Sequence, residues 1–199
     1  MTNDARRHAC TMIVAMTQIV VLNGGSSAGK SSIARALQLT LPAPWLTFGV
    51  DVLIDALPGR GDDPRSGIVF EIDGSISVTP NYQAIENAWY QGLATMARHG
   101  TRLILDEVLL SGAAGQRRLS EILDGLAVLW IGVHCDPLVA ARREASRADR
   151  IPGMALSQAT IVHDGARYDL QVDTTDCSPE ACAAQIAERI VPPSPTGVS

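Results

Sequence analysis

The chain has 199 residues, of which 46% are hydrophobic and 19% charged, a balance typical of a compact globular protein and not of a disordered one. Its 21 acidic residues outnumber its 16 lysines and arginines, and the net charge of −5 argues against binding nucleic acid through the phosphate backbone. No apolar run approaches the roughly 20 residues that span a bilayer, so no membrane partner is expected.

The N-terminal half is predicted to alternate strands and helices. Residues 18–23 read as a short buried strand, which is followed by a loop at 24–29 and a helix at 30–41 with apolar residues at helical spacing. A second strand at 45–50 leads into a short helix that starts at Asp51. This succession of strand, loop and helix indicates the first units of an α/β fold.

The middle of the chain is predicted to begin with a polar loop at 59–67. Two strands at 68–72 and 75–78 flank Asp73-Gly74, a pair of residues that favours a two-residue hairpin turn. Thr79 and Pro80 then have the order of an N-cap and first helical residue, so a helix is expected from there to about residue 100.

The C-terminal half continues the same alternation. Strands are expected at 102–105, 127–134 and 169–172, and helices at 115–123, 138–146, 156–163 and 179–190. The whole pattern predicts a three-layer α/β/α fold, a doubly wound parallel sheet of about five strands. We expect residues 1–16 to be an N-terminal extension, 17–191 a single P-loop kinase domain with a lid around 142–153, and 192–199 a tail.

One motif carries specific chemistry, the sequence GGSSAGKS that matches G-x-x-x-x-G-K-[ST]. Such a loop curls its backbone N–H groups around a phosphate, and the helix that follows points its positive end at the same place. Lys30 would reach the β- and γ-phosphates of ATP, and the Ser31 hydroxyl would bind Mg²⁺. The predicted nucleotide-binding residues are Gly24, Gly25, Ser26, Ser27, Ala28, Gly29, Lys30, Ser31 and Ser32.

The composition supports this interpretation. Lys30 is the only lysine of the chain, and all other basic residues are arginines. The sequence therefore keeps the compact ammonium group at the one position where a P-loop needs it.

Carboxylates and arginines suggest the rest of the site. Asp51 follows the second predicted strand, and Asp106 and Glu107 follow the third, so all three should border the loop at the carboxyl edge of the sheet. Phosphorylation of an alcohol needs a carboxylate that takes the hydroxyl proton and positive charge on the transferred group. Arginines on or after one helix could supply that charge; they are Arg142, Arg143, Arg147 and Arg150.

The sequence resembles the chloramphenicol phosphotransferases. The residues that carry the resemblance are IVVLNGGSSAGKSS at 19–32, LPAPWLTFGVDVLIDA at 41–56, LAVLWIGVHCD at 126–136, REASRADRIPGM at 143–154, IVHDGARYD at 161–169 and VDTT at 172–175. They run in order along nearly the whole chain outside the tails.

The resemblance implies roles for individual residues. Asp51 matches the catalytic base, Lys30 the P-loop lysine, and Arg147 and Arg150 the lid arginines that contact the phosphates. Asp106 stands at the metal side, where an Asp-Asp pair is expected and Asp-Glu is found. The loop of Thr174 lies beside the adenine in related kinases. The segments at 58–67 and 68–78 look distinct from the family pattern, and they fall where an acceptor would be chosen.

These features predict an ATP- and Mg²⁺-dependent phosphotransferase that acts on a small-molecule alcohol, most simply the primary hydroxyl of chloramphenicol. A kinase of a sugar-like or nucleoside alcohol and a non-enzymatic nucleotide-binding switch are the alternatives. Trp89 and Met96 could line the acceptor pocket, although core packing is favoured for both, and structural roles are favoured for His134 and His163. Four cysteines without a CxxC pair or nearby histidine ligands indicate reduced thiols and a cytoplasmic location. A homo-oligomer is possible.

Overall fold

A computed structural model describes residues 16–61, 63–70, 76–146 and 153–190 of the chain. Most of the predicted extension and the whole of the predicted tail therefore lie outside the described residues, as does the centre of the predicted lid. None of the described helices has the length and apolar character needed to cross a membrane.

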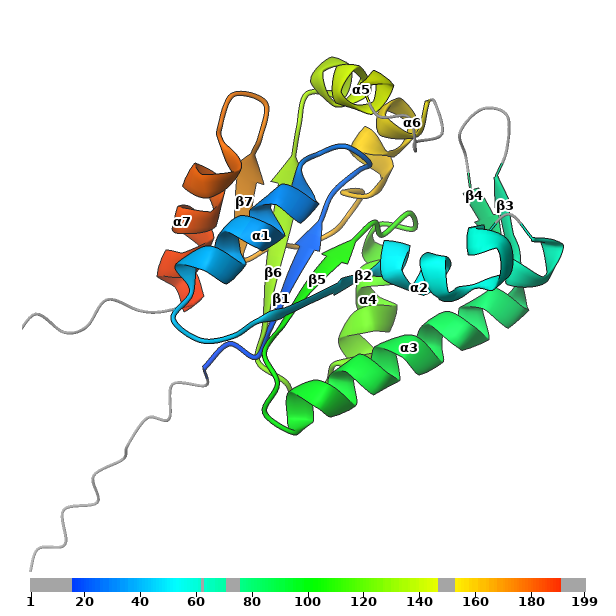
Figure 1. The fold of residues 1–199 in the computed structure, drawn as a ribbon, viewed down its shortest axis with the longest axis horizontal. Coiled ribbons are helices and arrows are strands. Elements are labelled where there is room, and N and C mark those ends of the chain that lie inside the picture. Colours follow the sequence, from blue (N-terminus) through cyan, green and yellow to red (C-terminus); the bar gives the residue numbers. More distant parts are fainter. Residues whose placement is uncertain (1–15, 62, 71–75, 147–152, 191–199) are drawn as a thin grey trace, which may run out of the picture.

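Five parallel strands form the central sheet, in the order β2-β5-β1-β6-β7 (Figure 1). The strands are β1 (Ile19–Asn23), β2 (Leu46–Gly49), β5 (Leu103–Glu107), β6 (Val128–His134) and β7 (Leu170–Asp173). In β1, Val20 and Leu22 point to one face of the sheet and Ile19 and Val21 to the other, and all four are completely buried. A strand covered on both faces needs apolar residues without interruption, which is why β1 reads as an unbroken apolar run.

Helices cover both faces of the sheet and complete the predicted three-layer fold. On one face, α1 (Lys30–Thr40) packs beside α7 (Pro179–Ile190). On the other lie α3 (Pro80–Arg98) and α4 (Ala113–Ile122). The remaining helices are α2 (Val50–Ala56), α5 (Pro137–Ala145) and α6 (Met154–Ile161). The predicted doubly wound α/β architecture is confirmed.

The predicted helix starts follow capping chemistry. The Thr79 hydroxyl accepts a hydrogen bond from the Tyr82 N–H at the start of α3, with Pro80 as the first helical residue. At the start of α5, the Asp136 carboxylate accepts hydrogen bonds from the N–H groups of Leu138 and Val139. Because these caps use local sequence alone, they could be predicted from it.

The described residues of 57–61, 63–70 and 76–79 form a smaller unit beside the sheet (Figure 1). The segment predicted as a plain loop contains two 3₁₀ turns, η1 (Pro58–Gly61) and η2 (Pro64–Ser66). The predicted hairpin pairs β3 (Ile68–Phe70) with β4 (Ile76–Val78) in antiparallel register, and its Asp73-Gly74 turn lies outside the described residues. Ile68 packs with Leu53 of α2 and Tyr82 of α3, so the hairpin stands beside the start of α3.

Candidate active site

The glycine-rich loop joins β1 to α1 at the carboxyl edge of the sheet (Figure 1). A Cβ atom on Gly24 would lie 2.5 Å from the Val133 carbonyl oxygen of β6, so this position requires a glycine. Ser27 has φ of 57°, and Gly29 has φ of 89° at the N-cap of α1. These left-handed residues bend the backbone into the curl that a phosphate-binding loop needs.

Lys30, Ser31 and Asp106 come together at the first turn of α1, as the sequence predicted. The buried Lys30 ammonium donates a hydrogen bond to the Gly25 carbonyl oxygen at 2.9 Å and lies 3.6 Å from the Asp106 carboxylate. The Ser31 hydroxyl donates to the other Asp106 carboxylate oxygen at 2.6 Å. The Lys30 ammonium and the side-chain oxygens of Ser31 and Asp106 thus lie beside the loop in which the phosphates would sit.

The hydroxyls of Ser26 and Ser27 have no hydrogen-bond partner among the described residues. Both oxygen atoms are buried. Buried polar atoms are normally paired, and a bound phosphate would supply partners at this place. The loop residues therefore fit the predicted nucleotide site.

The side-chain oxygens of Ser31 and Asp106 also fit as ligands of Mg²⁺. This ion is usually held by one or two protein oxygens together with substrate phosphates and water, not by a cage of protein ligands. Ser31 and Asp106 provide such a pair, and the described residues contain no cluster of three or more His, Cys, Asp or Glu side chains that could hold a metal alone.

Asp106 and Glu107 differ from the prediction in place, and Glu107 also differs in orientation. They are the last two residues of β5, not residues that follow it. Successive strand residues face opposite sides, so Asp106 meets Ser31 while Glu107 turns toward α3 and accepts a hydrogen bond from the Tyr90 hydroxyl at 2.7 Å. Burial raises the pKa of Glu107 to about 8, and the nearby Asp106 and Glu86 carboxylates add to this effect.

One large cavity connects the loop with Asp51. It has a volume of about 910 Å³ and is lined by Ser27, Lys30, Ser31 and Asp106 on the loop side. Asp51, in the first turn of α2, lines the same cavity and is exposed to it. The predicted base, the P-loop lysine and the predicted metal ligands thus share one cavity.

A further polar wall of this cavity is not identified by the sequence motifs. It is formed by Tyr82, Glu86 and Tyr90 on α3, and by Arg118 of α4, whose guanidinium is paired with the Glu86 carboxylate. The signal was present, because residues 82, 86 and 90 are spaced by four and share one helix face.

The tryptophan and methionine considered for the acceptor pocket, and the two histidines expected to be structural, pack against other side chains. Trp89 packs edge-on against Phe48, with ring centroids 5.9 Å apart, and Met96 packs against the same core, as the favoured interpretation held. His134 and His163 stack on each other with ring centroids 4.0 Å apart, outside the cavity. Arg147 and Arg150 lie outside the described residues.

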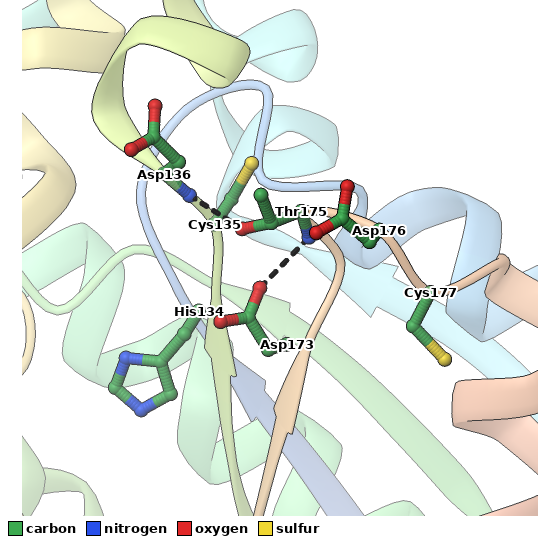
Figure 2. A pocket seen from close by; sticks show the side chains of 7 residues that line it. All are labelled: His134, Cys135, Asp136, Asp173, Thr175, Asp176 and Cys177. Atoms are coloured by element: carbon green, nitrogen blue, oxygen red, sulfur yellow. Dashed lines mark hydrogen bonds between the residues drawn. The ribbon is translucent and has the colours of Figure 1, made fainter.

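A second hollow, of about 710 Å³, lies between the ends of β6 and β7. Figure 2 shows Thr175 at its centre, where its hydroxyl accepts a hydrogen bond from the Asp136 N–H and its own N–H donates to the Asp173 carboxylate. The hydrogen bonds of Thr175 hold the pKa of Asp173 below its ordinary value. The residues around the hollow are His134, Cys135, Asp136, Asp173, Thr175, Asp176 and Cys177. This is the loop that was expected beside the adenine.

Thr174 itself points away from that hollow. Its buried hydroxyl donates to the Ala28 carbonyl oxygen of the phosphate loop at 2.8 Å. The Arg143 guanidinium donates a hydrogen bond to the Thr174 carbonyl oxygen at 2.7 Å and so holds the loop that follows β7. Arg143, one of the arginines considered for the phosphoryl group, is thus engaged with the β7 loop, while Arg142 is exposed.

Comparison with known proteins agrees with this geometry. A family model described as "Chloramphenicol phosphotransferase-like protein" matches residues 17–191. Two proteins from strains of Mycobacterium tuberculosis, each named "Putative O-phosphotransferase", are 30% identical over 183 residues, which cover 86% of this chain and 81% of each relative.

Solved structures show the same fold at low sequence identity. A sugar kinase from Janibacter sp. HTCC2649 superposes with a TM-score of 0.60 at 16% identity, covering 87% of this chain and 93% of that one. The APS kinase CysC from Mycobacterium tuberculosis, in complex with AMPPNP and APS, has a TM-score of 0.56 at 14% identity, covering 87% and 97%. The chain belongs to the chloramphenicol phosphotransferase-like family, and it is a phosphotransferase with the fold of the P-loop kinases.

Proposed function

We propose that this phosphotransferase moves the γ-phosphoryl group of ATP, with Mg²⁺, to the hydroxyl of a small molecule, and that the primary hydroxyl of chloramphenicol is its acceptor. One observation carries the proposal: Lys30, Ser31 and Asp106 gather at the phosphate loop, and Asp51 lines the same cavity. The family match supports chloramphenicol as the first acceptor to test.

The reaction requires one proton transfer and one exchange of bonds to phosphorus. The acceptor oxygen forms a bond to the γ-phosphorus as the bond from that phosphorus to the ADP oxygen breaks, and the hydroxyl proton passes to the Asp51 carboxylate. Lys30 holds positive charge beside the migrating group. Ser31 and Asp106 would hold Mg²⁺, which when bound neutralises charge on the phosphate oxygens.

We also retain the other assignments as proposals. Arg147 and Arg150 would contact the phosphates from a lid within 142–153, and the loop of Thr174 would lie beside the adenine. The thiols of Cys135, Cys177 and Cys182 are free, which supports a reducing, cytoplasmic location.

A kinase of another small alcohol is the second candidate. The polar wall of Tyr82, Glu86, Tyr90 and Arg118 favours it, because four hydrogen-bonding side chains suit an acceptor with several hydroxyls. A panel of sugar-like and nucleoside alcohols separates this candidate from chloramphenicol. A nucleotide switch, the third possibility, would hydrolyse ATP and yield no phosphorylated acceptor, and it would have no use for Asp51 in the cavity.

The test is mass spectrometry of chloramphenicol incubated with the protein and Mg-ATP. We expect a product heavier by one phosphoryl group, and we expect Asp51→Asn to abolish it while ATP binding persists, since the amide cannot take the proton. Asp55→Asn is the matched control, because Asp55 lies one turn further along α2 and lines the same cavity. Turnover by Asp51→Asn near the wild-type rate would remove Asp51 as the base.

A further inference from the structure

Gln158 of α6 reaches across the fold to the phosphate loop. Its side chain is 2% exposed, and its Oε1 atom accepts a hydrogen bond from the Ser26 N–H at 2.9 Å. The backbone of α6 also packs on the loop, because a Cβ atom on Gly25 would lie 3.3 Å from the Gln158 carbonyl carbon. The sequence gives no hint of this contact, which joins residues 132 positions apart.

The bond holds the loop at the point where its backbone is strained. Ser27, directly after Ser26, is a non-glycine residue with φ of 57°. A side chain in this region is unfavourable, and such a conformation persists only where neighbouring groups hold it. Gln158 is one of those groups, so its loss should let the loop relax and should turn the N–H groups away from a common centre.

Glu144 fixes the helix from which Gln158 extends. Gly153, the N-cap of α6, has no side chain with which to cap the helix. The buried Glu144 carboxylate of α5 accepts hydrogen bonds from the N–H groups of Gly153 and Ala155 instead, both at 2.8 Å. The start of α6 is therefore anchored from outside, and Gln158, one turn further on, is aimed at Ser26.

We propose that Gln158 is a positioning residue of the phosphate loop, whose neutral carboxamide takes the Ser26 N–H and keeps the loop curled for a triphosphate. The proposal rests on the proposed function, since it assumes that the loop binds ATP. Neutrality matters because Gln158 lines the same cavity as the loop. A carboxylate there would still accept the hydrogen bond, but its charge would repel the phosphates.

The experiment measures the dissociation constant of Mg-ATP by calorimetry on the full chain, without any acceptor. The variants are Gln158→Leu, which removes the hydrogen-bond acceptor, and Gln158→Glu, which keeps it and adds charge. Gln116→Leu is the control, because Gln116 of α4 makes a similar side-chain bridge to the backbone of Arg167 and does not line the cavity. Thermal unfolding of each variant shows that it is folded.

We expect Gln158→Leu to weaken binding by about tenfold, because the loop loses a hydrogen bond that holds its curl and must be reordered when the nucleotide binds, while Gln116→Leu stays near wild type. Gln158→Glu should bind more weakly than Gln158→Leu. A purely structural role predicts the reverse order, because glutamate restores the bond. Wild-type affinity in Gln158→Leu, or tighter binding by Gln158→Glu than by Gln158→Leu, would overturn the proposal. Failure of the wild type itself to bind Mg-ATP would instead reject the proposed function.

Discussion

At the scale of single residues, the Lys30 ammonium is oriented by the protein before any substrate contact. The Gly25 carbonyl oxygen accepts its hydrogen bond, and the Asp106 carboxylate lies 3.6 Å away. The side chain is buried, so little of it is free to adopt other positions. A cation held in place in this way needs little reorganisation when charge develops on a transferred group.

Replacement of Lys30 by alanine should therefore weaken both nucleotide binding and turnover. Loss of a preorganised charge at a transition state commonly lowers kcat by about 100- to 1,000-fold. Steady-state kinetics with ATP as the varied substrate measures the effect, and Arg35→Ala is the control, since Arg35 is an exposed cation on the same helix. Unchanged kinetics in Lys30→Ala would reject the assignment of the phosphate loop.

At the scale of elements, β5 serves two parts of the cavity with adjacent residues. Asp106 faces the phosphate loop and Glu107 faces α3, because strand residues alternate between the two sides of the sheet. The wall on α3 is completed by α4, where Arg118 pairs with Glu86. Burial raises the pKa of Glu86, and the Arg118 guanidinium opposes that rise.

Arg118→Ala should raise the KM for the acceptor several-fold while leaving the affinity for Mg-ATP unchanged. The change leaves the Glu86 carboxylate, which lines the cavity, without its Arg118 partner. Kinetics with each substrate varied in turn separate the two effects. Arg117→Ala removes the adjacent, exposed arginine and should behave as wild type. Equal values of the acceptor KM in both variants would show that this wall does not bind the acceptor.

At the scale of the whole molecule, the fold was predictable because local signals agreed with each other. Apolar runs marked β1, β5 and β6, capping residues marked α3 and α5, and the phosphate motif stood between a strand and a helix as it must. The loop half of the site followed from the motif. The pairing of Arg118 with Glu86 and the contact of Gln158 with Ser26 did not, because each joins elements distant in sequence and depends on how they pack.

The pH dependence of stability is another property of the whole molecule, and His163 contributes to it. Burial, followed by the nearby positive charges of His134 and Lys30, lowers its pKa to about 4, against 6.5 for a free histidine. The unfolded chain therefore binds the proton more readily, so His163 opposes folding increasingly as the pH falls from about 6.5 toward 4.

Wild-type protein should accordingly lose more stability than His163→Gln when the pH is lowered from about 7 to 5, a range that spans the ordinary histidine pKa. Urea unfolding of both proteins at the two pH values gives the difference. His99→Gln, a change at an exposed histidine, should follow the wild type. Equal losses in wild type and His163→Gln would show that the burial of this ring does not govern its protonation.

The solitary lysine has a consequence for chemical labelling. Apart from the α-amino group, the chain offers one amine, and that amine lies buried in the phosphate site. Reagents that acylate amines can therefore form a stable side-chain amide only at Lys30, and a bound nucleotide would shield it. The extent of Lys30 acylation would thus report how much of the phosphate loop is occupied by nucleotide, without signal from other lysines.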